Sequence, residues 1–167
     1  MAEMALRFAS VSFAWDAVHP LLKELSLEIA PSECVALVGR NGAGKSTLFK
    51  LACGLLKPAR GRIDVGGLHT ANARAPQLAR QVALMFQEAE RQICQDRVAA
   101  EVAFAPRLAG LEAGEVGRRV AHALEVTGLS DRANAHPLDL NGGERRLLTL
   151  ASLIAQDTAL VLLDEPT

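Results

Sequence analysis

The segment 39–47 has the residue types and the order of a phosphate-binding loop. It runs Gly39-Arg40-Asn41-Gly42-Ala43-Gly44-Lys45-Ser46-Thr47 and matches the pattern Gly-x4-Gly-Lys-Ser/Thr. Glycines adopt at low cost the backbone conformations that turn several N–H groups towards one phosphate. In such a loop Lys45 reaches the β- and γ-phosphates, the Ser46 hydroxyl serves Mg²⁺, and Thr47 follows in the first helical turn. The segment predicts a nucleoside triphosphate site, and by itself it does not decide between ATP and GTP.

A second candidate for a catalytic or metal-binding role is an acidic pair late in the sequence. Asp164 and Glu165 follow the apolar run Val161-Leu162-Leu163, as expected for a buried strand that ends in a carboxylate. Asp164 would then lie where Mg²⁺ sits, and Glu165 would orient and deprotonate an attacking water. An acidic pair at a strand end is common by itself. Its presence in one chain with the glycine-rich loop favours a phosphoryl-transfer site.

Several strands are predicted to position these residues. Apolar residues recur at every second position in 4–30, which predicts antiparallel strands, and Arg62–Val65 predicts another strand. Continuous apolar runs predict strands that are buried on both faces, at 34–38, 82–86 and 159–163.

Helical patterns alternate with these strands. A helix at 46–56 follows the loop, and from 96 to 138 the apolar period shifts towards 3.6, with Asp96 as a candidate cap of the first helix there. A further helix covers 142–155. The alternation predicts an α/β fold with a helical insert at about 88–143.

Composition excludes several other classes of protein. The chain is 50% hydrophobic, which is enough for a sizeable core, and its net charge of −1 argues against nucleic acid as a partner. The cysteines Cys34, Cys53 and Cys94 are widely spaced and predict reduced thiols rather than a zinc site or disulfides, with Cys34 and Cys53 buried. No apolar run approaches the roughly 20 residues that span a bilayer. A role at a membrane would therefore act through a partner.

With these motifs in this order, the chain resembles the ATPases of the ATP-binding cassette (ABC) transporter family. Gln87 follows the strand that ends in Met85-Phe86, where the family has its glutamine loop. Trp15 aligns with an aromatic residue that stacks on adenine, a role that needs only a flat π face. Leu140-Asn141-Gly142-Gly143-Glu144 occupies the family signature, usually Leu-Ser-Gly-Gly-Gln, and differs from it at Asn141 and Glu144.

The resemblance implies a role for each of these residues. Glu165 is expected to be the general base, supported by Gln87 and Lys45, and the Mg²⁺ contacts are expected from Ser46, Gln87 and Asp164. ATP would be bound by Trp15, Gly39, Asn41, Gly42, Ala43, Gly44, Lys45, Ser46 and Thr47 of one protomer and by Asn141, Gly142 and Gly143 of the opposite protomer.

The resemblance also implies a fold: a P-loop NTPase core with an N-terminal antiparallel β subdomain and an inserted helical subdomain. We expect one nucleotide-binding domain over 1–167, with the β subdomain and P-loop core at 1–87, the helical subdomain at 88–143, and the signature helix and Walker B strand at 144–167. Family members continue beyond the Asp-Glu pair. The C-terminal part of the core is therefore expected to be missing, and this chain alone is expected to be inactive.

The implied function is ATP hydrolysis that powers import, performed peripherally at the cytoplasmic face of the membrane. The partners would be a second ABC ATPase protomer, identical or paralogous, and a transmembrane coupling subunit. Within the family, 82–106 is most similar to the energy-coupling-factor ATPases, which serve uptake of metal ions such as cobalt and nickel or of vitamins. Two alternatives stay open: an ATPase of another ABC importer, and a truncated nucleotide-binding polypeptide that does not hydrolyse ATP. An off-membrane ATPase of DNA repair or translation is disfavoured by the near-zero net charge.

Overall fold

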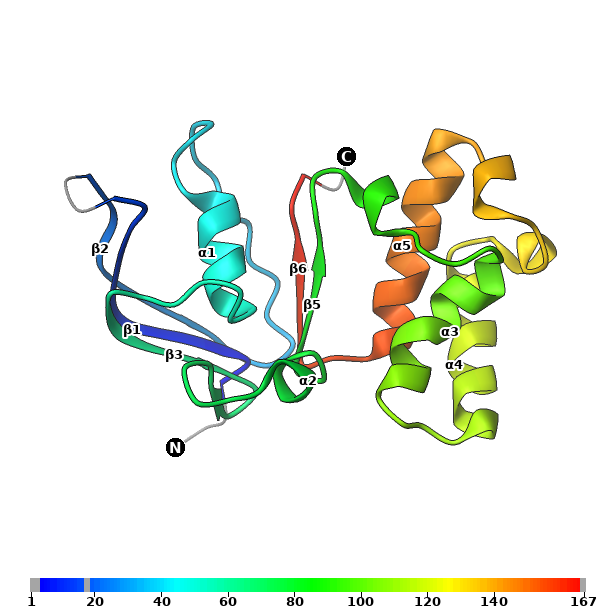
Figure 1. Ribbon diagram of the computed structural model, residues 1–167, viewed down its shortest axis with the longest axis horizontal. Helices are drawn as coiled ribbons and strands as arrows, with labels where there is room; N and C mark the ends of the chain where they lie inside the picture. Colours follow the sequence, from blue (N-terminus) through cyan, green and yellow to red (C-terminus); the bar gives the residue numbers. More distant parts are fainter. Residues whose placement is uncertain (1–3, 17–18, 166–167) are drawn as a thin grey trace. The chain divides into compact units, whose positions relative to one another are not determined.

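The apolar alternation near the N-terminus produces an antiparallel sheet in the computed structural model, which describes residues 4–16 and 19–165. Its strands are β1 (Leu6–Ala14), β2 (Pro20–Ile29), β3 (Arg60–Val65) and β4 (Leu68–His69). They lie in the order β2-β1-β3-β4, and β1 pairs antiparallel with both of its neighbours (Figure 1). The expected antiparallel strands are therefore confirmed.

A β-bulge in β1 explains why its buried positions change from even to odd numbers. Leu6 and Phe8 are buried, and the next buried residue is Val11, three positions later. Ser10 between them has φ 49°, and the register with β2 shifts at this point. The neighbouring strand accommodates the bulge with Gly61, where a Cβ would come within 2.4 Å of the Ser10 carbonyl oxygen. The bulge thus keeps one apolar face of β1 directed into the core.

Helix α1 (Lys45–Ala52) covers this core and follows the predicted phosphate loop. Its residues Leu48, Leu51 and Ala52 are buried in one cluster with Phe8 and Ile63 and other residues of the sheet. The helix ends earlier than 56 because Gly54, with φ 69°, closes its C-terminus and donates its N–H to the Leu51 carbonyl oxygen. Cys53 is only partly buried, where it was expected to be buried, and packs against the same cluster; burial raises the pKa of its thiol to about 11.

The strand predicted at 34–38 is absent, and this part of the prediction is wrong. The segment has no regular secondary structure, and its side chains are exposed, with Val38 at 91%. Cys34, expected to be buried, is exposed as well. A continuous apolar run forms a strand only where neighbouring strands satisfy its backbone and layers cover both of its faces. Among the described residues, no strand pairs with this segment.

The two remaining strands are β5 (Val82–Met85) and β6 (Leu160–Leu163), which form a separate two-stranded sheet. The Leu160 N–H donates to the Gln81 carbonyl oxygen, and the Asp164 N–H donates to the Met85 carbonyl oxygen. The residue numbers of the paired positions increase in the same direction on both strands, so the two strands are parallel. Val161 and Leu163 are 46% and 38% exposed. One face of β6 is therefore open, although both faces were expected to be buried.

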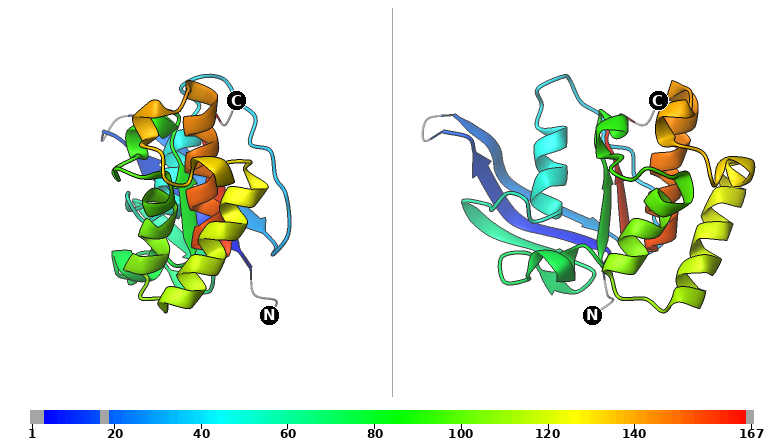
Figure 2. Two further views of the ribbon diagram at one scale, coloured as in Figure 1. Left: turned by 90° about the vertical axis from the view of Figure 1, so that its right-hand side faces the viewer. Right: turned by 45° about the vertical axis from the view of Figure 1, so that its right-hand side comes forward.

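Among the described residues, a helical unit comprises Met85–Asp157 and 163–165, and a first unit comprises those up to Leu84 together with Thr158–Leu162. It contains α3 (Val98–Leu108), α4 (Ala113–Val126) and α5 (Gly142–Gln156), and the short helices η1 (Ala89–Gln92), η2 (Ser130–Arg132) and η3 (Pro137–Asp139). The three long helices lie side by side (Figure 2). Buried side chains of all three, among them Val102, Ala123 and Leu148, form one core. Helix α2 (Ala75–Leu78) belongs to the first unit. Within the described residues, no helix is long and apolar enough to cross a membrane.

The start of α3 is organised by a glutamate rather than by the predicted cap. The N-cap is Arg97, not Asp96, and no side chain caps the helix. Instead Glu101, which is 7% exposed, accepts hydrogen bonds from the Cys94 and Gln95 N–H groups, both at 2.9 Å. A carboxylate that accepts from two backbone N–H groups holds the preceding turn firmly. This contact ties the chain after Gln87 to the helical core.

Candidate functional site

The predicted phosphate loop enters α1 through two glycines in the left-handed region. Gly42 has φ 80° and Gly44 has φ 95°, values that side chains with a Cβ disfavour. Gly44 is the N-cap of α1, and no side chain caps this helix. The first N–H groups of α1 therefore remain open to an anion, which the positive end of the helix dipole also attracts. A Cβ at Gly42 would meet no atom within 4 Å, so the loop borders open space.

Lys45 folds back over its own loop. Its Nζ donates to the carbonyl oxygens of Gly39, at 2.8 Å, and of Arg40, at 3.2 Å. Ser46 beside it is exposed and Thr47 is 8% exposed. The ammonium group is thus held at the loop, where anionic phosphate oxygens would be stronger acceptors for it than neutral carbonyl oxygens.

The other two loop residues of the prediction, Asn41 and Ala43, are both exposed. The Ala43 N–H donates to the Arg40 carbonyl oxygen at 3.1 Å. This bond closes the turn in front of Gly44.

Trp15 lies directly after β1 and is available for stacking. It is 60% exposed, while Phe13, two residues earlier, is 8% exposed and belongs to the core. The two rings meet edge to face, with centroids 5.2 Å apart and an interplanar angle of 88°. The buried Phe13 thus anchors an indole of which more than half remains accessible to a flat ligand.

The parallel pairing of β5 and β6 brings two predicted catalytic residues together. Gln87 follows β5 and Glu165 follows β6, and Gln87 Nε2 donates to Glu165 Oε2 at 2.7 Å. Glu165 has φ 52°, a left-handed conformation that is unusual for a residue with a side chain. Both residues are exposed, so a water can reach the carboxylate.

Asp164 differs from its neighbour because it is only 8% exposed. Its backbone N–H donates to the Met85 carbonyl oxygen, and no hydrogen bond joins its carboxylate to another of the described residues. A carboxylate on a largely buried residue, without a protein donor, is suited to a cation, and oxygen ligands are those that Mg²⁺ prefers. No group of three or more His, Cys, Asp or Glu side chains with metal-binding geometry occurs among residues 4–16 and 19–165. The donor set therefore fits Mg²⁺ that takes most of its ligands from phosphate and water.

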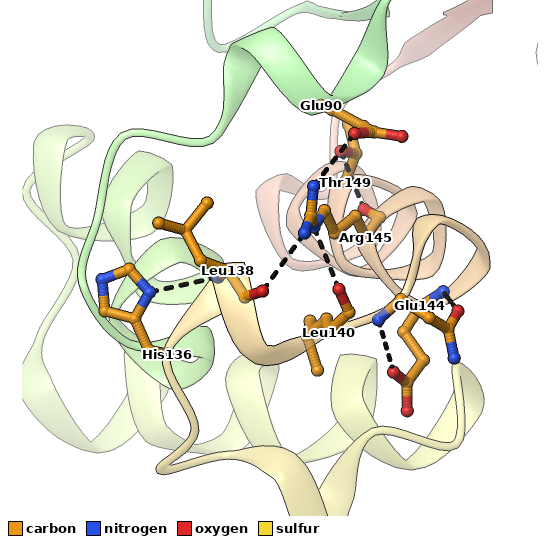
Figure 3. Close-up of polar contacts among 8 residues, drawn as sticks. Glu90, His136, Leu138, Leu140, Glu144, Arg145 and Thr149 are labelled. Carbon is orange, nitrogen blue, oxygen red and sulfur yellow. Dashed lines mark hydrogen bonds and ion pairs between the residues drawn. The ribbon is translucent and has the colours of Figure 1, made fainter.

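The predicted signature residues form the N-terminus of α5. Asn141 is the N-cap: its Oδ1 accepts from the Glu144 N–H at 3.0 Å, and the Glu144 carboxylate accepts from the Asn141 N–H at 2.9 Å (Figure 3). This reciprocal pair is a capping box. The N–H groups of Gly142 and Gly143 take no part in it. The two residues that differ from the usual signature, Asn141 and Glu144, thus both cap the N-terminus of α5. The N–H groups of Gly142 and Gly143 stay free to bind a ligand.

The predicted site residues fall into two sets, one in each unit. Trp15 and 39–47 belong to the first unit, whereas Gln87, 141–143, Asp164 and Glu165 belong to the second. Within the second unit the structure joins Gln87 to Glu165 directly.

A family model described as ABC transporter matches residues 22–167. The chain belongs to this family. It is 40% identical over 157 residues to a putative ABC transporter ATP-binding protein of Pyrococcus furiosus, a match that covers 94% of this chain and 60% of the relative. It is 39% identical over 147 residues to the energy-coupling factor transporter ATP-binding protein EcfA of Syntrophomonas wolfei, covering 87% of this chain and 54% of the relative.

Among solved structures, cbiO1 from Clostridium perfringens, part of the ABC transporter complex cbiONQ, superposes with a TM-score of 0.86 at 26% identity. This match covers 97% of the present chain and 65% of cbiO1. The ABC ATPase fold expected from the sequence is confirmed. The chain spans roughly 54–62% of the length of the first curated relatives that it matches.

Two residues near the ABC signature were missed by reasoning from sequence. Arg145, in the first turn of α5, contacts Glu90 of η1 across 55 positions of the chain. Their opposite charges are visible in the sequence, but a single sequence does not show which of many charged residues pair.

The capping box gives a stability prediction for the signature. Asn141→Ala removes the acceptor for the Glu144 N–H and should lower the free energy of unfolding by about 1 kcal/mol. Asn141→Ser keeps an acceptor and should lose less. Urea unfolding of the full-length protein measures both, with Asn134→Ala as the matched control because Asn134 is exposed and caps no helix. Equal stability of the Asn141→Ala and Asn134→Ala variants would contradict the role of the cap.

Proposed function

We propose that this chain is the nucleotide-binding part of an ABC ATPase that hydrolyses ATP to power transport through a membrane partner. The proposal is carried by the 2.7 Å hydrogen bond between Gln87 Nε2 and Glu165 Oε2, next to the buried Asp164. It places a carboxylate that can deprotonate water beside an amide that can orient the water. This arrangement favours turnover over binding alone.

In the proposed site, the open N–H groups of α1 and the Lys45 ammonium bind the phosphates, and Trp15 stacks on adenine. When bound, Mg²⁺ neutralises charge on the phosphate oxygens, and Ser46, Gln87 and Asp164 are the residues that would hold it. Glu165 accepts a proton from the attacking water as the new P–O bond forms at the γ-phosphorus. The β–γ bridging bond breaks, and ADP leaves with its electron pair.

The signature turn is proposed to act on the ATP of a second protomer. Gly142 and Gly143 offer open N–H groups at the N-terminus of α5, where a phosphate is favoured. Two protomers arranged in this way would enclose two ATP molecules, each between one phosphate loop and the partner's signature turn. The remaining partner would be a transmembrane coupling subunit, with the ATPase bound peripherally at the cytoplasmic face of the membrane.

Within the family we propose the energy-coupling-factor type, which imports a metal ion or a vitamin. The resemblance of 82–106 and the similarity to EcfA and to cbiO1 support this assignment. The test is uptake of radiolabelled cobalt, nickel or vitamins by vesicles that contain the full-length protein and its membrane partner. ATP-dependent uptake of amino acids alone would instead favour another importer class.

The proposed adenine contact can be tested by tryptophan fluorescence, since Trp15 is the only tryptophan within residues 1–167. ATP binding to the full-length protein should change the Trp15 emission. Trp15→Ala should weaken ATP binding about tenfold, because stacking of a base on an aromatic ring contributes about 1–3 kcal/mol. Trp15→Phe keeps a π face and is the matched control. Calorimetry compares the two variants, and unchanged affinity in Trp15→Ala would remove this residue from the site.

A further inference from the structure

Arg145 connects three parts of the helical unit through one guanidinium group. Its Nε donates to the Leu140 carbonyl oxygen and its Nη2 to the Leu138 carbonyl oxygen, each at 3.1 Å. Its Nη1 contacts Glu90 Oε2 at 3.3 Å (Figure 3). The planar guanidinium carries several N–H donors, so Arg145 can bind all three acceptors at the same time. Arg145 therefore fixes the backbone that leads into the signature turn relative to η1.

The carboxylate of Glu90 also borders the signature itself. A Cβ added to Gly142 would stand 3.7 Å from Glu90 Oε1, the oxygen not paired with Arg145. Glu90 thus faces the start of α5 with one oxygen and holds Arg145 with the other. Glu90 therefore contacts residues that hold the signature turn in place, and it is not part of the hydrophobic core.

The other end of the same short segment reaches the proposed general base. Gln87, three positions before Glu90, donates to Glu165. The segment between them is internally bonded: the Arg91 N–H donates to the Glu88 carbonyl oxygen at 3.0 Å, and the Phe86 N–H donates to Gln92 Oε1 at 3.0 Å. These bonds give the segment between Gln87 and Glu90 a defined conformation.

We propose that Glu90 and Arg145 form a positioning pair that couples the Gln87–Glu165 contact to the signature turn of the same chain. This inference rests on the proposed function, in which Glu165 serves the chain's own ATP and the signature turn serves the ATP of the other protomer. The pair then links the two ATP sites of the dimer. Glu90 and Arg145 touch no reacting atom, and they act through the residues that they hold.

The test compares Glu90→Gln with wild type in the full-length protein. Phosphate release is measured against ATP concentration, and ATP binding is measured separately by Trp15 fluorescence. We expect the Hill coefficient to fall from about 2 towards about 1 and kcat to fall about three- to tenfold, with the Kd for ATP changed less than about twofold. Glu90→Asp keeps the charge and should restore part of the cooperativity.

Glu88→Gln is the matched control, because Glu88 pairs with Arg91 in the same segment and both side chains are mostly exposed. This variant should behave as wild type, because the Glu88–Arg91 pair joins two residues of the same segment and holds no part of the signature turn. Equal losses in Glu88→Gln and Glu90→Gln, unchanged cooperativity in Glu90→Gln, or a wild-type Hill coefficient of 1 would overturn the inference alone. A wild-type protein that does not hydrolyse ATP would overturn the proposed function together with the inference.

Discussion

Glu165→Gln should lower steady-state phosphate release by about 10²–10⁴-fold, the usual contribution of a general base. The amide has nearly the same shape as the carboxylate, and its oxygen can still accept the hydrogen bond from Gln87 Nε2. It cannot take a proton from water. ATP binding should therefore remain close to that of wild type while hydrolysis stops.

The measurement is phosphate release by the full-length protein at saturating ATP, with binding followed by calorimetry. Glu125→Gln is a suitable control, because Glu125 is exposed on α4 and belongs to no part of the proposed site. Hydrolysis at the wild-type rate in Glu165→Gln would show that another group deprotonates the water. Loss of binding in the variant would show instead that the carboxylate has a structural role.

Lys45→Ala should weaken ATP binding by about 10–100-fold, because a hydrogen bond to a charged group contributes about 1.5–3 kcal/mol. The Nζ group also donates to the Gly39 and Arg40 carbonyl oxygens, so its removal is expected to loosen the loop itself. Equilibrium unfolding separates the two effects: loosening would lower stability without ATP, whereas a phosphate contact affects only the ATP-bound protein.

Lys50→Ala is the matched control for Lys45→Ala. It removes the same charge from the last turn of the same helix, away from the loop. Fluorescence titration should give this variant wild-type affinity for ATP. If the two variants bind ATP equally well, Lys45 does not contact the phosphates.

The sequence predicted the local features of the fold because these depend on short-range chemistry. Apolar alternation predicts β1 and β2, and the glycine pattern before Lys45 predicts a turn into a helix. Gly42 and Gly44 both have the positive φ that such a turn needs. The bulge at Ser10 was not visible, since it shifts the pattern by one position without changing the types of residue.

The prediction at 34–38 shows the limit of this reasoning. An apolar run indicates that a segment is suited to a buried strand, but it does not show that neighbouring strands are present to pair with that segment. Val38 is 91% exposed because backbone pairing and coverage are properties of the surrounding chain.

The sequence alone determined which residue types are available for phosphate chemistry and in which local elements they lie, since turn, cap and strand preferences act over a few residues. Only the tertiary structure decided which of them meet. Gln87 and Glu165 are 78 positions apart and Glu90 and Arg145 are 55 apart. Such contacts follow from the pairing of β5 with β6 and from the packing of α5 against η1, which bring together residues far apart in the sequence and do not depend on any short segment.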